Sequence, residues 1–319
     1  MRLNSFAAFV TLLGIVSLPI AAHADSSLTV GKAAATASVM LPANLGVEFG
    51  IFKKHELDVK VADFAGGSKL FQAMTAGSVD IGIATGTGMA FTAKGAPILA
   101  ICEHEPQMTP SGIGLPWDST IQKVDELKGK RIGISSPGSF TDWLASSLAR
   151  QRGWGPNGIT KVSVGNGMAS TAAAFRTQMV DAAITPTAEL LEMEEKHEGR
   201  LLMSVASFAG NMAAGTVFAT KRAMEDRPET VRAFLAAWLE TLEYMRTHKD
   251  ETVKAESKLT GFSPSVMAKE YDINVPGFKR DCKFDAESLA NLKRSFEELK
   301  LLNEPPDMST LYTEAFMPQ

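Results

Sequence analysis

The sequence is poor in cysteine: Cys102 and Cys282 are the only two among its 319 residues. A C-x-x-C redox motif is therefore absent. In an oxidising compartment the two thiols can form a bridge, and closing so long a loop would stabilise the fold by up to about 5 kcal/mol. Otherwise each thiol packs in the core as a small hydrophobic group. The sequence leaves both alternatives open.

Motifs of nucleophilic, metal-dependent and nucleotide-dependent catalysis are also missing. There is no G-x-S-x-G, no H-E-x-x-H and no Walker phosphate-binding loop. Gly86-Thr87-Gly88 follows a predicted strand, but Phe91 stands where a dinucleotide-binding loop carries its third glycine. No pair of carboxylates is placed as general acid and base. We therefore expect neither an enzyme nor a bound cofactor.

Excess positive charge is absent, and histidine is scarce. The formal net charge is −4, which argues against a nucleic-acid or anionic-membrane surface. His104 lies between Glu103 and Glu105, but adjacent residues on an extended segment point to opposite faces, so no metal site is predicted. His55, His197 and His248 lie among charged residues and are expected at the surface. The acidic residues of 192–198 are interpreted as one solvated helix face.

Only the N-terminus carries a long apolar segment. Arg2 supplies a positive start, residues 6–20 are mostly apolar, and Ala22-His23-Ala24 fits the cleavage rule of secreted proteins. The apolar run is shorter than the roughly 20 residues that cross a bilayer. We therefore predict a cleaved signal peptide at residues 1–24 and a soluble, periplasmic protein.

After the leader, short apolar strands alternate with amphipathic helices, which is typical of βαβ units around mainly parallel sheets. The remaining chain of about 295 residues exceeds the usual size of a single core, so two lobes are expected. A helix that runs into Val79-Asp80 is echoed 101 residues later by a helix that runs into Val180-Asp181. This echo agrees with two lobes of one design.

Small polar residues follow several predicted strands, at the sheet edge where α/β proteins bind ligands. Gly66-Gly67-Ser68 and Pro137-Gly138-Ser139 each lead into a helix. A helix N-terminus offers unpaired N–H groups that attract an anion, although an ordinary N-cap explains each turn taken alone. The predicted ligand-binding residues are Thr36, Ser38, Gly67, Ser68, Thr85 and Thr87 in the first lobe, and Ser136, Gly138, Ser139, Thr141 and Pro186 in the second.

Several segments, in order along nearly the whole chain beyond the leader, resemble the nitrate/sulfonate/taurine-type substrate-binding proteins of ABC transporters, which include binders of thiamine precursors. The matching segments are 47–52, 57–59, 64–68, 72–80, 93–97, 125–133, 136–139, 218–220, 228–244, 306–307 and 311–312. Two features depart from the family pattern. Gln178 stands where relatives often have glycine, and the loop 33–38 lacks the aromatic and proline residues of many relatives.

The resemblance implies a type II periplasmic-binding fold, which is an α/β fold of two lobes joined by two crossover strands, with C-terminal helices. Residues 25–105 together with 214–319 would form the first lobe, and residues 106–213 the second. The lobes would close around a solute like a hinge. A membrane permease and an ATPase would be the partners.

We therefore interpret the chain as the monomeric, periplasmic solute-binding component of an ABC importer. The expected solute is a small organic anion, a sulfonate or carboxylate, held between the turns of the two lobes. Phe140 and Trp143, next to the second turn, would either stack on an aromatic solute or pack in the core. Two alternatives stay open: an enzyme of the thiamine-pyrimidine synthase type on the same fold, and a sensory module that presents its ligand to a receptor.

Overall fold

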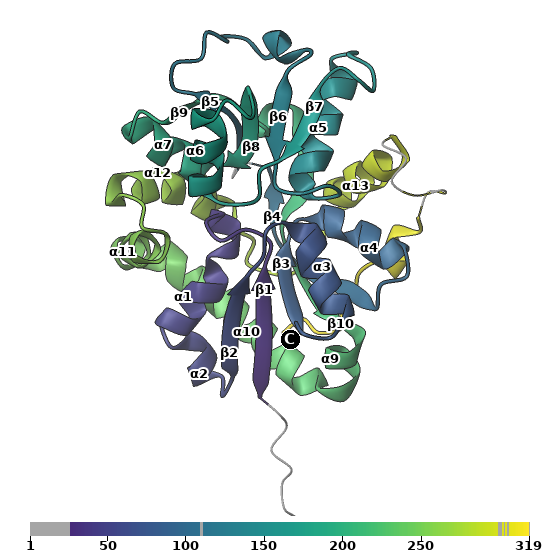
Figure 1. The fold of residues 1–319 in the computed structure, drawn as a ribbon. Coiled ribbons are helices and arrows are strands. Elements are labelled where there is room, and N and C mark those ends of the chain that lie inside the picture. The colour runs from purple at the N-terminus through teal and green to yellow at the C-terminus, as the bar shows by residue number, and fades with distance from the viewer. Residues whose placement is uncertain (1–25, 109–110, 299–301, 303, 305, 319) are drawn as a thin grey trace, which may run out of the picture.

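Two five-stranded sheets, each flanked by helices, make up the computed structural model of the chain (Figure 1). The structure describes residues 26–108, 111–298, 302, 304 and 306–318. The predicted signal peptide lies outside these residues. Within the described ranges, none of the helices combines the length and the apolar character that a membrane crossing needs.

The first sheet has the strand order β2-β1-β3-β10-β4. β1 pairs in parallel with β2 and β3, whereas β10 pairs antiparallel with β3 and β4. The strands are β1 (Ser27–Lys32), β2 (Asp58–Asp63), β3 (Ile81–Ala84), β4 (Ile98–Gln107) and β10 (Asn211–Thr220).

The second sheet, with the order β7-β6-β8-β5-β9, repeats this pattern of directions. β6 pairs in parallel with β7 and β8, and β5 pairs antiparallel with β8 and β9. The strands are β5 (Ser111–Pro116), β6 (Arg131–Ile134), β7 (Thr160–Ser163), β8 (Ala182–Pro186) and β9 (Gly199–Ser204). The two sheets confirm the α/β fold with one sheet in each lobe. They are mixed sheets, because the two strands that follow the crossovers run against the others.

The chain passes between the sheets twice. It leaves the first sheet after β4 to enter β5, and it returns from β9 through α8 (Ala206–Ala209) to β10. β4 and β10 are neighbours in the first sheet, so the chain leaves this sheet and returns to it at the same region of the molecule (Figure 1).

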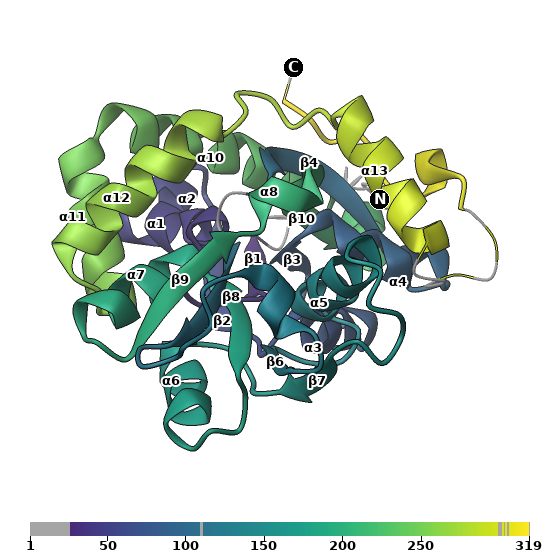
Figure 2. The ribbon, with the colours of Figure 1, turned by 90° about the horizontal axis from the view of Figure 1, so that it is seen from above.

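Helices cover both sheets, and a further set follows β10. α10 is the longest, and it begins with Pro228 at its first position, where the missing N–H of proline costs nothing. Figure 2 shows α10, α11 and α12 together on one side of the molecule. The helices of the first lobe are α1 (Pro42–Glu48), α2 (Ile51–Lys54), α3 (Gly67–Thr75) and α4 (Met89–Ala93). Those of the second lobe are α5 (Phe140–Gln151), α6 (Met168–Arg176) and α7 (Thr187–Glu195). The later ones are α9 (Lys221–Asp226), α10 (Pro228–Thr247), α11 (Lys249–Thr260), α12 (Pro264–Asn274) and α13 (Ala286–Glu298).

The Val-Asp echo in the sequence corresponds to one hydrogen-bonding device used in both lobes. The carboxylate of Asp80 accepts the N–H of Thr29 at the start of β1 (3.0 Å), and that of Asp181 accepts the N–H of Arg131 at the start of β6 (2.8 Å). The N–H groups of the two aspartates donate back to the carbonyls of the same partners, each at 2.9 Å. Asp80 thus joins β3 to β1, and Asp181 joins β8 to β6, the second and third strands across each sheet. This supports the interpretation of two lobes of one design.

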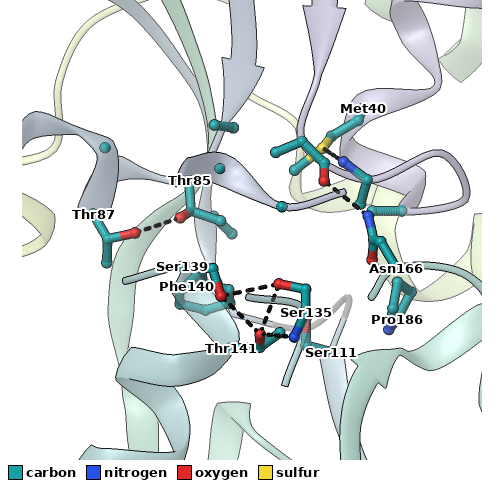
Figure 3. Close-up of a pocket in the computed structure, with 18 of the residues that line it drawn as sticks. Met40, Thr85, Thr87, Ser111, Ser135, Ser139, Phe140, Thr141, Asn166 and Pro186 are labelled. Carbon is teal, nitrogen blue, oxygen red and sulfur yellow. Dashed lines mark hydrogen bonds between the residues drawn. The ribbon is translucent and has the colours of Figure 1, made fainter. Parts of the chain in front are cut away.

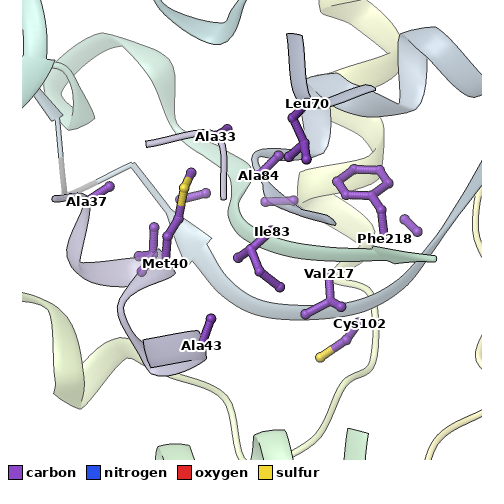
Figure 4. Close-up of a cluster of buried hydrophobic side chains, with 14 of the residues drawn as sticks. Ala33, Ala37, Met40, Ala43, Leu70, Ile83, Ala84, Cys102, Val217 and Phe218 are labelled. Carbon is purple, nitrogen blue, oxygen red and sulfur yellow. The ribbon is translucent and has the colours of Figure 1, made fainter. Parts of the chain in front are cut away.

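The core of the first lobe lies between its sheet and α3. Leu70 and Phe218 are fully buried there, and Ile83 and Val217 are fully buried on the opposite face of the same sheet (Figure 4). A methyl group on Gly31 of β1 would come within 2.4 Å of the Leu70 Cδ1 atom, so glycine is what allows α3 to pack this closely. Burying one such side chain contributes about 1.5–3 kcal/mol.

Cys102 and Cys282 form a disulfide, which decides between the two alternatives left by the sequence. Cys102 lies on β4, in the middle of the first-lobe core, and both residues are buried. The bond joins positions 180 residues apart. It attaches the segment that precedes α13 to a strand that leads from one lobe to the other.

The acidic face of α7 is not fully solvated, contrary to the prediction. Glu192 is buried, accepts the N–H of Ser263 (2.7 Å) and pairs with Lys196 (2.8 Å). Glu195 accepts hydrogen bonds from the hydroxyls of Ser263 and Ser265. Both carboxylates therefore lie at the N-terminus of α12, where unpaired N–H groups and the helix dipole favour negative charge. They join α12 to the second lobe.

Gln178 provides a test of backbone strain. It has φ 53°, in the left-handed region, at the position equivalent to Gly77 (φ 75°) of the first lobe. Gln178→Gly should raise the free energy of unfolding by about 0.5–1 kcal/mol, because left-handed backbone is costly for residues with a Cβ. Gly77→Ala, which has no close neighbour to clash with, should lower it by about 1 kcal/mol. Urea unfolding of the three proteins measures both changes, and a destabilised Gln178→Gly protein would contradict the argument.

The disulfide provides a second test. Replacing both cysteines by alanine should lower the free energy of unfolding by about 2–5 kcal/mol, because the unfolded chain regains the freedom of a long loop. Denaturant unfolding with and without a reductant measures the effect. Reductant should lower the free energy of unfolding of the wild type and leave that of the double variant unchanged. Equal stability of the two proteins would contradict a structural role for the bond.

Candidate ligand-binding site

A cavity lies between the two sheets and is lined by residues of both lobes (Figure 3). The centre of a water-sized sphere can occupy about 70 Å³ of it. We call it the inner chamber. Its lining residues are Ala33, Ala34, Ala37, Val39, Met40, Gly66, Gly67, Phe71, Ala84, Thr85, Thr87, Gly88, Phe91 and Ala214 of the first lobe, and Met108, Ser111, Ser135, Gly138, Ser139, Phe140, Thr141, Asn166, Thr185 and Pro186 of the second.

The lining of the inner chamber is electrically neutral. None of these lining residues is an Asp, Glu, His, Lys, Arg or Cys. Three phenylalanines contribute, and the rings of Phe71 and Phe91 stack with their centroids 4.9 Å apart. Met40 and Met108 add polarisable sulfur, which adapts to aromatic guests. The chamber can therefore hold an apolar or aromatic group and offer it hydrogen bonds, but it offers no charge.

The hydroxyls of the second lobe form a closed network at the start of α5 (Figure 3). Ser135 Oγ lies 2.9 Å from both Ser139 Oγ and Thr141 Oγ1, and the last two are 3.0 Å apart. The N–H of Ser135 also donates to Thr141 Oγ1 (2.8 Å). On the opposite wall Thr85 and Thr87 join hydroxyls at 2.8 Å. These groups satisfy one another, and each keeps lone pairs that can accept from a solute.

The N-terminus of α5 already has an anionic group. Ser139 is the N-cap and accepts the N–H of Asp142 (3.4 Å). The Asp142 carboxylate in turn accepts the N–H of Gly138 (2.7 Å). The protein's own carboxylate therefore takes one of the amides that the sequence suggested for an anionic solute.

The two lobes approach so closely at Gly66 that a side chain would not fit. A Cβ atom there would lie 2.7 Å from the hydroxyl oxygen of Ser136, and the φ of 100° disfavours any other residue. The hydroxyl of Ser68 donates to the carbonyl of Pro137 in the other lobe (2.9 Å). The turns 66–68 and 135–138 thus contact each other directly at one edge of the chamber.

Two side chains of the second lobe hold the loop 33–38 of the first. Asn166 donates to the carbonyl of Ala33 (2.8 Å). Glu189, which is fully buried, accepts hydrogen bonds from the hydroxyls of Thr36 in the first lobe and Thr185 in its own. Burial raises the pKa of the Glu189 carboxyl, partly offset by these two hydroxyls. The lobes are therefore joined by direct hydrogen bonds around the chamber.

Seven of the eleven residues predicted for the site line the inner chamber: Gly67, Thr85, Thr87, Gly138, Ser139, Thr141 and Pro186. The other four do not line the inner chamber. Ser68 and Ser136 are at the contact between the turns, and Thr36 binds Glu189. Ser38 is buried beside the Glu270 carboxyl.

Sequence reasoning missed several lining residues, among them Asn166, Ser111, Ser135 and the two methionines. The sequence carries one signal for Asn166. It precedes Gly167, which lies 101 positions after Gly66, the same offset as the Val-Asp echo. In the structure the φ of 107° and ψ of 151° of Gly167 before α6 match those of Gly66 before α3 (100° and 158°). The repeat therefore marks the Asn166 turn as the second-lobe counterpart of the Gly66 turn.

Residues 40–252 match the family model described as NMT1/THI5 like. Among curated proteins, the chain is 24% identical over 295 residues to the 4-amino-5-hydroxymethyl-2-methylpyrimidine phosphate synthase THI11 of Saccharomyces cerevisiae, covering 87% of this chain and 84% of that protein. It is 25% identical over 291 residues to the synthase of the same name from Legionella pneumophila, covering 87% and 88%.

Among solved structures, the chain is similar to the alkanesulfonate-binding protein SsuA from Xanthomonas axonopodis pv. citri bound to MOPS. The TM-score is 0.78 at 20% sequence identity, and the match covers 90% of this chain and 98% of that one. At this identity the likeness establishes the fold, which is that of the periplasmic binding proteins.

The Glu189 link provides a test through pH. Because burial raises the folded-state pKa of Glu189, its protonated form is favoured by folding, and stability should fall as the pH rises above about 4.5, the value of a free carboxyl. Glu189→Gln keeps a hydrogen-bonding group for each threonine and cannot ionise, so it should lose less stability than the wild type between pH 5 and pH 8. Urea unfolding at both pH values measures the difference. The same loss in both proteins would contradict it.

Proposed function

The chain belongs to the NMT1/THI5-like family, and from this premise we propose that it is the exported solute-binding component of an ABC-type importer. It holds a small organic anion, a sulfonate or a carboxylate, between its lobes and releases it unchanged. The observation that carries the proposal is the neutral inner chamber enclosed between two sheets of different lobes.

The lining of the inner chamber suits reversible binding. Its hydroxyls have no basic side chain among the lining residues to activate them as nucleophiles, and no acid to protonate a leaving group. What it does present is apolar surface with a few hydrogen-bonding groups, the usual composition of a small-molecule site. The similarity to a protein named as alkanesulfonate-binding supports a solute of this kind.

In this proposal the lobes, residues 25–105 with 214–319 and residues 106–213, move as bodies about the two connections between the sheets. A solute that touches both walls of the chamber favours the closed arrangement, because it gains contacts there that the open one lacks. The hydrogen bonds from Asn166 and Ser68 across the chamber edge add to that preference. The protein acts as a monomer that delivers its solute to a permease and an ATPase.

Export is proposed from the leader at residues 1–24, and the disulfide is consistent with it. Structural disulfides persist in oxidising compartments such as the periplasm. The bond between Cys102 and Cys282 lies in the core of the first lobe, so it is part of the folded structure.

Synthesis of 4-amino-5-hydroxymethyl-2-methylpyrimidine phosphate is the second candidate, because the curated relatives carry that name. Expression of the chain without residues 1–24, in cells that cannot make this compound, separates the two functions. Growth without the added pyrimidine would support the enzyme. Failure to grow, together with solute recovered unchanged from the purified protein, would support the binding protein.

A substitution that fills the chamber tests the location of the site. Thr87 is partly buried on the chamber wall, and Thr87→Trp should abolish retention of the solute that native mass spectrometry detects on the purified protein. Adding the recovered solute at a hundred times its Kd should stabilise the wild type by about 2.7 kcal/mol and leave this variant unchanged. Thr247→Trp, at the exposed end of α10, is the control and should bind normally. Undiminished binding by Thr87→Trp would place the site elsewhere.

A further inference from the structure

A second cavity, which we call the outer chamber, adjoins the inner one. The centre of a water-sized sphere can occupy about 240 Å³ of it. Thr87, Phe91, Gly138 and Ser139 line both cavities, so the two meet at these residues. The remaining lining residues are Ala90, Lys94, Asp142, Trp143, Ser146 and Lys161. Residues of both lobes meet here too.

The outer chamber carries the charge that the inner one lacks. Lys94 ends α4 in the first lobe, and within the described part of the chain its ammonium has no hydrogen bond or ion pair. Lys161, in the second lobe, contacts the Asp142 carboxylate (2.5 Å) and donates to the Ser146 hydroxyl (2.9 Å). Two lysines against one carboxylate leave one positive charge without a partner.

Trp143 contributes an aromatic side chain to this wall, and it also lines a cavity between α5 and α13. Its side chain is 7% exposed, and its indole Nε1 has no hydrogen-bond partner among the described residues. The ring of Trp143 stacks with that of Phe140, which lines the inner chamber.

We propose that the outer chamber binds the anionic group of the solute, between Lys94 of the first lobe and Lys161 of the second, while the apolar or aromatic body of the solute fills the inner chamber. This inference rests on the proposed function and assigns an orientation to the solute. The solute class is an amphipathic organic acid, with its charged end toward the outside of the cleft.

The opposite orientation is unfavourable for two reasons. An anionic group in the inner chamber would lose its hydration without meeting a cationic side chain, and burying an unpaired charge is costly. The α5 N-terminus, the main alternative partner there, already binds the carboxylate of Asp142. In the outer chamber an anion gains an ammonium from each lobe, so it also favours closure.

Matched probes test the orientation. 3-Phenylpropanoate, its neutral amide and acetate differ only in charge or in the apolar body, and their Kd values are measured by isothermal titration calorimetry at neutral pH. The acid should bind up to about fivefold more tightly than the amide, since an exposed ion pair contributes up to about 1 kcal/mol. Acetate should bind far more weakly than either.

Lys94→Met should reduce acid binding to the level of the amide and leave amide binding unchanged, and Lys94→Arg should retain the preference for the acid. Lys254→Met, an exposed lysine of α11, is the control and should behave like the wild type.

Three results would overturn the inference. They are equal binding of acid and amide by the wild type, an equal loss of both on Lys94→Met, and no binding of any probe. If the amide binds as well as the acid and Thr87→Trp blocks both, the cleft still binds solutes, so the proposed function stands and only the orientation fails. If Thr87→Trp binds the acid like the wild type, the site lies elsewhere and both fail.

Discussion

Direct polar contact between the two lobes is the constraint on which the rest of the structure depends. The Asn166 amide, the Ser68 hydroxyl and the Thr36–Glu189 pair each join one lobe to the other, and they surround a single cavity. Glycine at position 66 is required because the opposite turn occupies the space of a side chain. A hydrogen bond of this kind contributes only about 0.5–1.5 kcal/mol net. The few that join the lobes therefore contribute only a modest net free energy.

Much of the fold could be predicted from the sequence, because it is set by local patterns. Alternating strands and amphipathic helices indicated two α/β lobes, and the Val-Asp echo marks the aspartates that join strands in each sheet. Small residues after the strands were expected near the site, since the ends of parallel strands meet at one sheet edge. Seven of the eleven predicted residues do line the cavity.

The remaining features depend on contacts between distant residues, which leave no local signal. The hydroxyl of Ser68, a predicted ligand-binding residue, donates to the carbonyl of Pro137 in the other lobe, and no local pattern indicates this contact. Glu189 and Thr36 stand 153 positions apart, and nothing near either one indicates the other. The solvated acidic face was predicted from charge alone, whereas Glu192 lies against the start of α12. The disulfide, likewise, depends on a spatial approach that spacing cannot reveal.

The position of β10 also determines the order in which the chain can fold. β10 lies between β3 and β4, so the first sheet stays divided until the chain has been made as far as Thr220. The second sheet uses only residues between Ser111 and Ser204, one continuous stretch of chain. During synthesis from the N-terminus, the internal lobe is thus the first that has all its strands. The lobe that contains β1 is completed last, and its disulfide forms only after Cys282 has been made.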